Sequence, residues 1–104
     1  MIRHVIQFNF KPELEESERV WILDRMRGLS KLPPVHHLVV GKLLEPKEDW
    51  YKQRICTDYA WTITLDFEDE AGLYAYQTDP YHVTVAQEIR QRVTVIKVSD
   101  FVLG

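Results

Sequence analysis

An alternation of apolar and polar residues along two separate segments constrains the fold of this sequence more than any other feature. Every second position of residues 1–10 and of residues 58–67 is apolar or aromatic, apart from one histidine. The repeated positions are Ile2, His4, Ile6, Phe8 and Phe10 in the first segment and Tyr59, Trp61, Ile63, Leu65 and Phe67 in the second. Successive side chains of a strand point to opposite faces, so this period of two predicts two β-strands, each with one buried face.

Two further strands are predicted from residue type. Residues 35–44 are rich in β-branched and apolar side chains, and residues 94–103 have the same character. Residues 45–57 are polar, contain Pro46 and show no clear period, so we expect a long loop there.

Two helical regions separate these strands. The first follows Lys11-Pro12, opens with glutamates that suit the positive end of a helix dipole, and ends at Leu32-Pro33-Pro34. Its buried stripe is predicted at Ile22, Leu23, Met26 and Leu29. The second begins at the N-cap candidate Asp69, runs through Tyr76 or Gln77, and resumes at Pro80, since proline is tolerated in a first turn. The resumed segment is predicted to share one stripe of His82, Val85, Ala86, Ile89 and Val93.

The order of the elements is therefore strand, helix, strand, strand, helix, strand. This order predicts an α+β, ferredoxin-like fold, in which helices cover one face of a four-stranded antiparallel sheet. A chain of 104 residues has the usual length of one domain, so we expect a single domain over residues 1–104. The uncovered face would mix polar residues with Val5 and Ala60, and could meet either water or a partner.

Charge and composition disfavour several classes of function. A net charge of -3 argues against a nucleic-acid-binding protein, which needs clustered Lys and Arg. No apolar run approaches the ~20 residues that span a bilayer, and residues 1–10 lack the features of a secretory leader. The lone Cys56 cannot form an internal disulfide, which suits a reducing compartment. We expect a cytoplasmic protein that binds neither nucleic acid nor membrane.

Two histidines occupy positions where apolar residues are expected. His4 lies on the apolar face of the first strand and His82 on the stripe of the last helix, so both should point between sheet and helices. Imidazole titrates near neutral pH and is the usual group for moving protons. Tyr76 lies six residues before His82 across the Pro80 turn, and its hydroxyl can reach the same space. Trp61 is expected to supply a wall of that pocket.

Four short stretches of the sequence together match the motifs of a known family. They are Ile2-Arg3-His4-Val5 followed by Phe8 and Phe10, Leu32-Pro33-Pro34-Val35, residues 76–83 (Tyr-Gln-Thr-Asp-Pro-Tyr-His-Val), and Val98-Ser99-Asp100-Phe101. In these stretches the chain resembles the stress-responsive A/B barrel family, called Dabb. The resemblance covers nearly the whole chain and implies a homodimer in which two sheets close a dimeric α+β barrel.

The resemblance also implies a chemistry. In polyketide-cyclase members of the family, a Tyr and a His at the positions of Tyr76 and His82 promote an aldol-type ring closure without metal or organic cofactor. We therefore predict that His82 acts as general base or acid and Tyr76 as a donor to an enolate oxygen, with no cofactor and no required metal. His4 and Trp61 are the predicted substrate-binding residues, for a small apolar or aromatic carbonyl compound. Trp61 and Asp79 each replace a histidine of those cyclases, which leaves the substrate open.

Other interpretations of the same residues remain. His82 and Tyr76 can be structural, with satisfied side chains in a filled core, and His4 can be an ordinary strand histidine. The protein can be a non-catalytic, stress-associated ligand-binding protein, or, by fold analogy alone, a cofactor-free monooxygenase. His36 and His37 are adjacent on a predicted strand and point to opposite faces, so they cannot hold one metal ion together.

Overall fold

A computed structural model describes residues 1–104. The chain forms four strands and four helices. The strands are β1 (Ile2–Phe10), β2 (His37–Lys42), β3 (Trp61–Phe67) and β4 (Val93–Val102). The helices are α1 (Glu16–Gly28), α2 (Asp49–Lys52), α3 (Glu70–Thr78) and α4 (Pro80–Arg90), and a 3-10 turn, Leu29–Lys31, follows α1.

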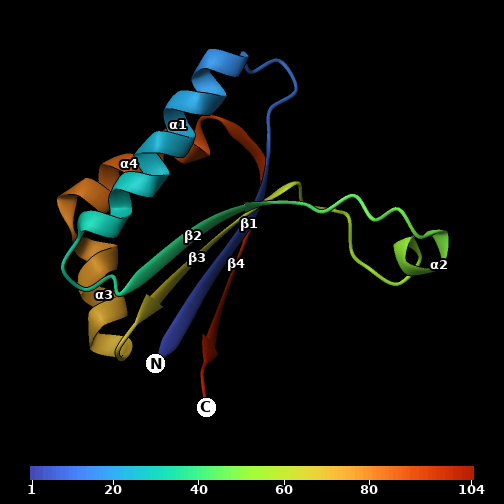
Figure 1. Ribbon diagram of the computed structural model, residues 1–104. Coiled ribbons are helices and arrows are strands. Elements are labelled where there is room, and N and C mark those ends of the chain that lie inside the picture. The colour runs from blue at the N-terminus through green and yellow to red at the C-terminus, as the bar shows by residue number, and fades with distance from the viewer.

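The strands form one antiparallel sheet in the order β2-β3-β1-β4. Helices α1, α3 and α4 cover one face of this sheet and leave the other face open (Figure 1). This is the four-stranded ferredoxin-like arrangement predicted from the order of the elements, and that prediction is confirmed.

The core lies between the sheet and the three covering helices. Burial alternates along the whole of β1, as the period of two predicts, and on the same face of β3 Ile63, Leu65 and Phe67 are fully buried while Trp61 is partly buried. Ile22, Met26 and Leu29 fill the space from the side of α1, and Val85 and Ile89 do so from α4. Fully burying an aliphatic side chain of this kind contributes about 1.5–3 kcal/mol, so this cluster is the main source of stability.

Aspartate side chains cap the N-termini of α3 and α4, the two helices that contain Tyr76 and His82. The Asp69 carboxylate accepts a hydrogen bond from the Gly72 backbone N–H at the start of α3. The Asp79 carboxylate does the same for the Tyr81 N–H at the start of α4, where Pro80 is the first helical residue. Pro80 already has the φ angle of a helix, and Asp79 caps the first turn of α4. Together they fix the angle between α3 and α4, and so the position of Tyr76 relative to His82.

Some boundaries differ from those predicted. β2 begins at His37 rather than at residue 35, because Pro34 and Val35 still belong to the turn that follows the 3-10 segment. Val93 was predicted on the stripe of the last helix, and that assignment is wrong. α4 ends at Arg90 and Val93 is the first residue of β4, where it pairs with Phe10 across a register shift.

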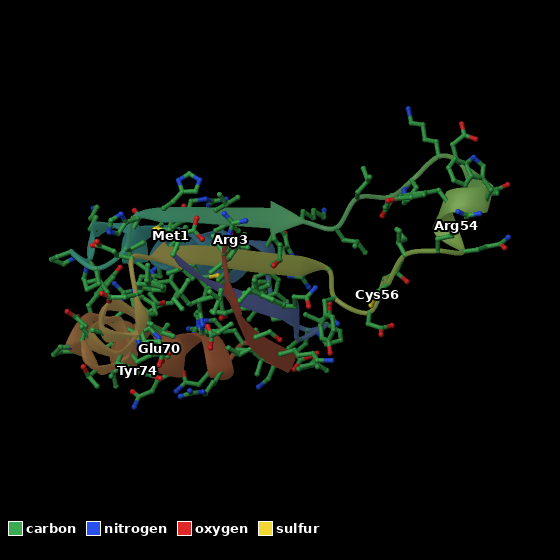
Figure 2. All side chains as sticks on the ribbon, turned by 90° about the horizontal axis from the view of Figure 1, so that it is seen from below. Met1, Arg3, Arg54, Cys56, Glu70 and Tyr74 are labelled. Atoms are coloured by element: carbon green, nitrogen blue, oxygen red, sulfur yellow. The ribbon has the colours of Figure 1, made fainter.

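The predicted loop between β2 and β3 contains one helical turn, α2, which the sequence pattern does not reveal. This segment extends away from the sheet, and the labelled Arg54, beside α2, and Cys56 lie on it far from α3, which carries the labelled Glu70 and Tyr74 (Figure 2). The Arg54 guanidinium lies over the Trp50 ring, which packs edge-on against Tyr51. None of the helices combines the length and the apolar content that a membrane span requires, and the expected cytoplasmic location stays a prediction.

Candidate functional site

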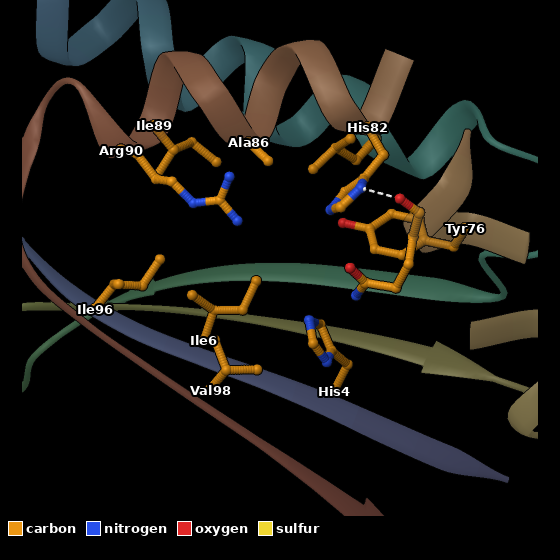
Figure 3. Close-up of a pocket in the computed structure, with 11 residues that line it drawn as sticks. His4, Ile6, Tyr76, His82, Ala86, Ile89, Arg90, Ile96 and Val98 are labelled. Atoms are coloured by element: carbon orange, nitrogen blue, oxygen red, sulfur yellow. Dashed lines mark hydrogen bonds between the residues drawn. The ribbon is translucent and has the colours of Figure 1, made fainter. Parts of the chain in front are cut away.

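A cavity of about 120 Å³ opens between the sheet and helices α3 and α4. Its wall is mostly apolar, with aliphatic side chains from β1, β4, α4 and the end of α1. The polar residues that line it are His4 from β1, Tyr76 and Gln77 from α3, and His82 and Arg90 from α4. Three of the four predicted site residues, His4, Tyr76 and His82, therefore meet in one place (Figure 3).

Tyr76 is fully buried, and its hydroxyl has no hydrogen-bond partner within the chain. The Tyr76 ring is held between Phe67, with ring centroids 5.1 Å apart, and His82, with centroids 4.3 Å apart. Burial raises the pKa of Tyr76 above its ordinary value, so the hydroxyl keeps its proton and can act as a donor. An unpartnered buried hydroxyl costs about 1–3 kcal/mol, which a ligand oxygen in the cavity would offset.

His82 is half-buried and bound to the backbone of the preceding turn. Its Nδ1 lies 3.0 Å from the Gln77 carbonyl oxygen, which can only accept, so Nδ1 carries a proton and donates it. In the neutral ring this leaves Nε2 as the free acceptor, and the ring is turned to the cavity (Figure 3). Burial lowers the pKa of His82, with the Gln77 carbonyl opposing that effect. A neutral imidazole with a free Nε2 at neutral pH is the form that a general base requires.

His4 is buried and oriented by a carboxylate on the neighbouring strand. His4 Nδ1 donates to Asp100 Oδ1 at 2.5 Å, and the two residues are direct cross-strand partners of β1 and β4. The His4 and Tyr76 ring centroids lie 6.3 Å apart. Because Asp100 fixes Nδ1, the Nε2 atom of His4 is the one left to meet a ligand.

Trp61 does not line this cavity. It pairs with Phe8 at the other end of β3, packs edge-on against Phe10, and lies under the Lys42 ammonium group. His4 pairs instead with Leu65, four residues further along β3. The structure thus separates Trp61 from the three other predicted residues along the length of the sheet.

Three polar residues at the site, Gln77, Arg90 and Asp100, were not predicted from sequence as site residues. Asp100 reaches His4 only through the β1–β4 register, which no local pattern gives. The position of Arg90 could have been predicted, because His82, Ala86 and Arg90 recur at intervals of four residues and so share one face of α4.

No group of three or more His, Cys, Asp or Glu side chains gathers in the arrangement that a metal ion needs. The prediction that no metal is required stays a prediction.

Comparison with known families places these residues in context. The model of the stress responsive A/B barrel domain, Dabb, matches residues 2–103. The chain belongs to this family. The resemblance that the Tyr76 to Val83 motif suggested is therefore confirmed over nearly the whole Dabb chain. No curated protein matches the sequence significantly.

Solved structures share the architecture of this Dabb chain. Hydroxynitrile lyase from Passiflora edulis matches with a TM-score of 0.87 and 17% identity, over 99% of this chain and 93% of its own. A Dabb family protein with a ferredoxin-like fold from Mesorhizobium loti gives 0.78 and 27%, over 99% and 97%. A dimeric ferredoxin-like protein of unknown function from Thermobifida fusca gives 0.79 and 19%, over 98% and 90%. Likeness at 17% and 19% identity shows the fold alone.

Proposed function

We propose that this protein is a cofactor-independent lyase, cyclase or isomerase that moves a proton on a small carbonyl compound. One observation carries the proposal: the Tyr76 hydroxyl is buried without a partner, directly against His82, at the wall of a cavity. A phenylalanine at position 76 would fill the core equally well and would avoid the loss of stability that an unpartnered buried hydroxyl causes.

The roles follow from the atoms. His82 Nε2, which is free because Nδ1 donates to Gln77, takes a proton from the carbon next to the carbonyl group. As negative charge develops on the carbonyl oxygen, the Tyr76 hydroxyl donates a hydrogen bond to it. His82 then returns the proton to the product. His4, fixed by Asp100, contacts the substrate from the sheet side.

A structural neighbour supports this class of reaction. The Passiflora edulis neighbour is a hydroxynitrile lyase on the same fold. Fold likeness is an analogy rather than a site match, so the proposal rests first on the geometry of Tyr76 and His82.

Deuterium exchange tests the proposal without knowledge of the natural product. Small stable ketones such as phenylacetone are incubated with the protein in D₂O, and the loss of the α-proton is followed by NMR. The wild-type protein should accelerate exchange, and His82→Ala should return it to the background rate. Tyr76→Phe should slow exchange by about 10²–10³-fold, the effect of removing one oxyanion donor.

Matched controls come from the same elements. Tyr74→Phe changes an exposed tyrosine on the same helix as Tyr76, and His36→Ala changes an exposed histidine outside the cavity. Both controls should exchange at the wild-type rate. Full exchange in His82→Ala and Tyr76→Phe would show that this pair does no chemistry.

A second function is favoured by the wall of the cavity. Six of its 11 lining residues are aliphatic, which suits a protein that holds a small apolar molecule without changing it. Saturable binding of the ketones with no exchange above background would support this ligand-binding function over the enzyme.

We also propose that the protein is a homodimer that pairs the open faces of two sheets. Val39, Val95 and Phe101 lie exposed on that face, by their register opposite Thr64, Asn9 and Arg3. Neighbours described as dimeric support the proposal.

In sedimentation experiments the wild type should be a dimer and Phe101→Glu a monomer. Val83→Glu, at an exposed position of α4, should remain dimeric. A monomeric wild type would contradict the proposal.

A further inference from the structure

Arg90 is the one cationic side chain that lines the cavity. It lies in the last turn of α4, two turns after His82 on the same face of the helix. Its guanidinium group extends from α4 into the cavity, above Ile6 and toward the side that holds His82 and Tyr76 (Figure 3). A molecule in the cavity would thus meet the guanidinium on one side and the His82 and Tyr76 pair on the facing side.

Arg90 differs from every other arginine of the chain in having no partner. Arg3, Arg25, Arg27 and Arg92 form salt bridges, Arg19 donates to backbone carbonyls, and Arg54 lies over the Trp50 ring. Arg90 is an exposed residue and makes no hydrogen bond, no salt bridge and no contact with an aromatic face, so its guanidinium is solvated until a ligand binds. The Asp100 carboxylate, which follows the cavity residue Val98 on β4, is bound to His4 Nδ1.

The chemistry of guanidinium decides what it can bind. Its planar fork of N–H donors matches the two oxygens of a carboxylate, and such charge-assisted pairs are roughly twice as strong as neutral hydrogen bonds. The aliphatic side chains of the cavity wall are those of Ile6, Leu29, Ala86, Ile89, Ile96 and Val98. The cavity of about 120 Å³ is comparable to cavities of roughly 150 Å³ that hold one benzene ring.

We propose that Arg90 determines the specificity of this cavity, and that its ligand is a small carboxylate with one ring or a short apolar chain. The carboxylate binds Arg90, the apolar part lies along Ile6, Ile89 and Ile96, and the other end reaches Tyr76 and His82. The assignment of a carbonyl group at that other end rests on the proposed function, whereas the anion site does not. The substrate class of the enzyme is then a small carbonyl-containing carboxylic acid.

Binding of two probes of equal size tests the charge recognition. Benzoate and benzamide differ in charge but hardly in shape, and their dissociation constants are measured by NMR titration at low ionic strength, where screening is weak. The wild type should bind benzoate about tenfold or more tightly than benzamide, the effect expected of one charge-assisted hydrogen-bond pair. Arg90→Gln should abolish this preference by weakening benzoate alone.

Two further variants separate the effect of the Arg90 guanidinium from a general effect of charge. Arg27→Gln removes one positive charge from an exposed site on α1, where Arg27 pairs with Asp24, and should leave the preference unchanged. Arg90→Lys keeps the charge without the fork, and should keep part of the preference. Equal binding of benzoate and benzamide to the wild type, no saturable benzoate binding, or a preference that survives Arg90→Gln would each overturn the inference.

The result is separable from the proposed function. A charge preference that depends on Arg90, together with ketone exchange unaffected by His82→Ala and Tyr76→Phe, would leave an anion-binding protein without the proposed chemistry. Exchange that depends on His82 and Tyr76, without an Arg90-dependent preference, would leave the chemistry and remove the carboxylate from the substrate.

Discussion

β1 and β4 are neighbours in the sheet, hydrogen-bonded to each other along their length, and yet their surroundings are opposite. Burial alternates along β1 from Ile2 to Phe10, whereas every residue of β4 after Val93 is exposed. Both strands carry apolar side chains on the face toward the helices. The difference arises because the core fills the helix side of β1, whereas the helix side of β4 borders the cavity at Ile96 and Val98.

This contrast shows where a site can form. The cavity lies at the boundary between the two environments, with His4 and Ile6 supplied by β1 and Ile96 and Val98 by β4. The buried side holds His4 and Tyr76 in fixed positions, and the open side admits a ligand. Preorganised groups beside an accessible apolar wall are what a small-molecule site needs.

The largest effect that the contrast predicts concerns stability. Phe8→Ala removes a fully buried ring from β1 and should lower the free energy of unfolding by about 3–5 kcal/mol. Phe101→Ala removes a ring that is 53% exposed on β4 and should cost less than about 1 kcal/mol in the monomer. Urea unfolding at low protein concentration measures both. Equal losses would mean that β4 is covered within one chain after all.

A smaller effect separates a structural from a functional Tyr76. Because its hydroxyl has no partner, Tyr76→Phe should leave the free energy of unfolding unchanged or raise it by about 1 kcal/mol, even though activity falls. Thermal or urea unfolding of the two proteins checks this. A clear loss of stability would show that the hydroxyl is satisfied in the folded chain and supports the core.

The smallest effect is a dependence of stability on pH. Burial lowers the pKa of His82, and His4 and Arg90 act in the same direction while Asp79 opposes them. The unfolded chain, with a histidine pKa near 6.5, then binds more protons than the folded one below that pH. The contribution of His82 to stability is therefore complete above about pH 6.5 and is lost as the pH falls toward the folded pKa.

His82→Gln should flatten this dependence, and the exposed His36→Gln should not. Unfolding free energies measured at a series of pH values distinguish the two variants. Parallel pH profiles for wild type and His82→Gln would show that the His82 imidazole titrates as it does in the unfolded chain.

The sequence was sufficient to predict the architecture because burial on one face leaves a period of two in β1 and β3 and a helical period in α1 and α4. It was less informative where burial is absent. α2 lies on an exposed segment with no apolar stripe, and the end of α4 was misplaced at Val93 because an apolar residue at the right spacing continues the stripe beyond the helix.

The site could be predicted in part for the same reason. His4 and His82 interrupt apolar patterns, and that interruption made them visible. The partner of His4, Asp100, depends on the pairing of strands that are 96 positions apart in sequence. Trp61 fits the apolar pattern of β3 as well as Leu65 does, and only the register shows which of them lies opposite His4.

NMR of the His82 ring nitrogens, between about pH 4 and pH 9 with and without a carbonyl ligand, tests whether His82 is a base, in wild type and in Tyr76→Phe. We expect a neutral ring with its proton on Nδ1 at pH 7, a pKa below about 6.5, and a change at Nε2 on ligand binding that depends on Tyr76. A ring protonated on Nε2, or one that does not respond to the ligand, would contradict a role for His82 as the base of an active site.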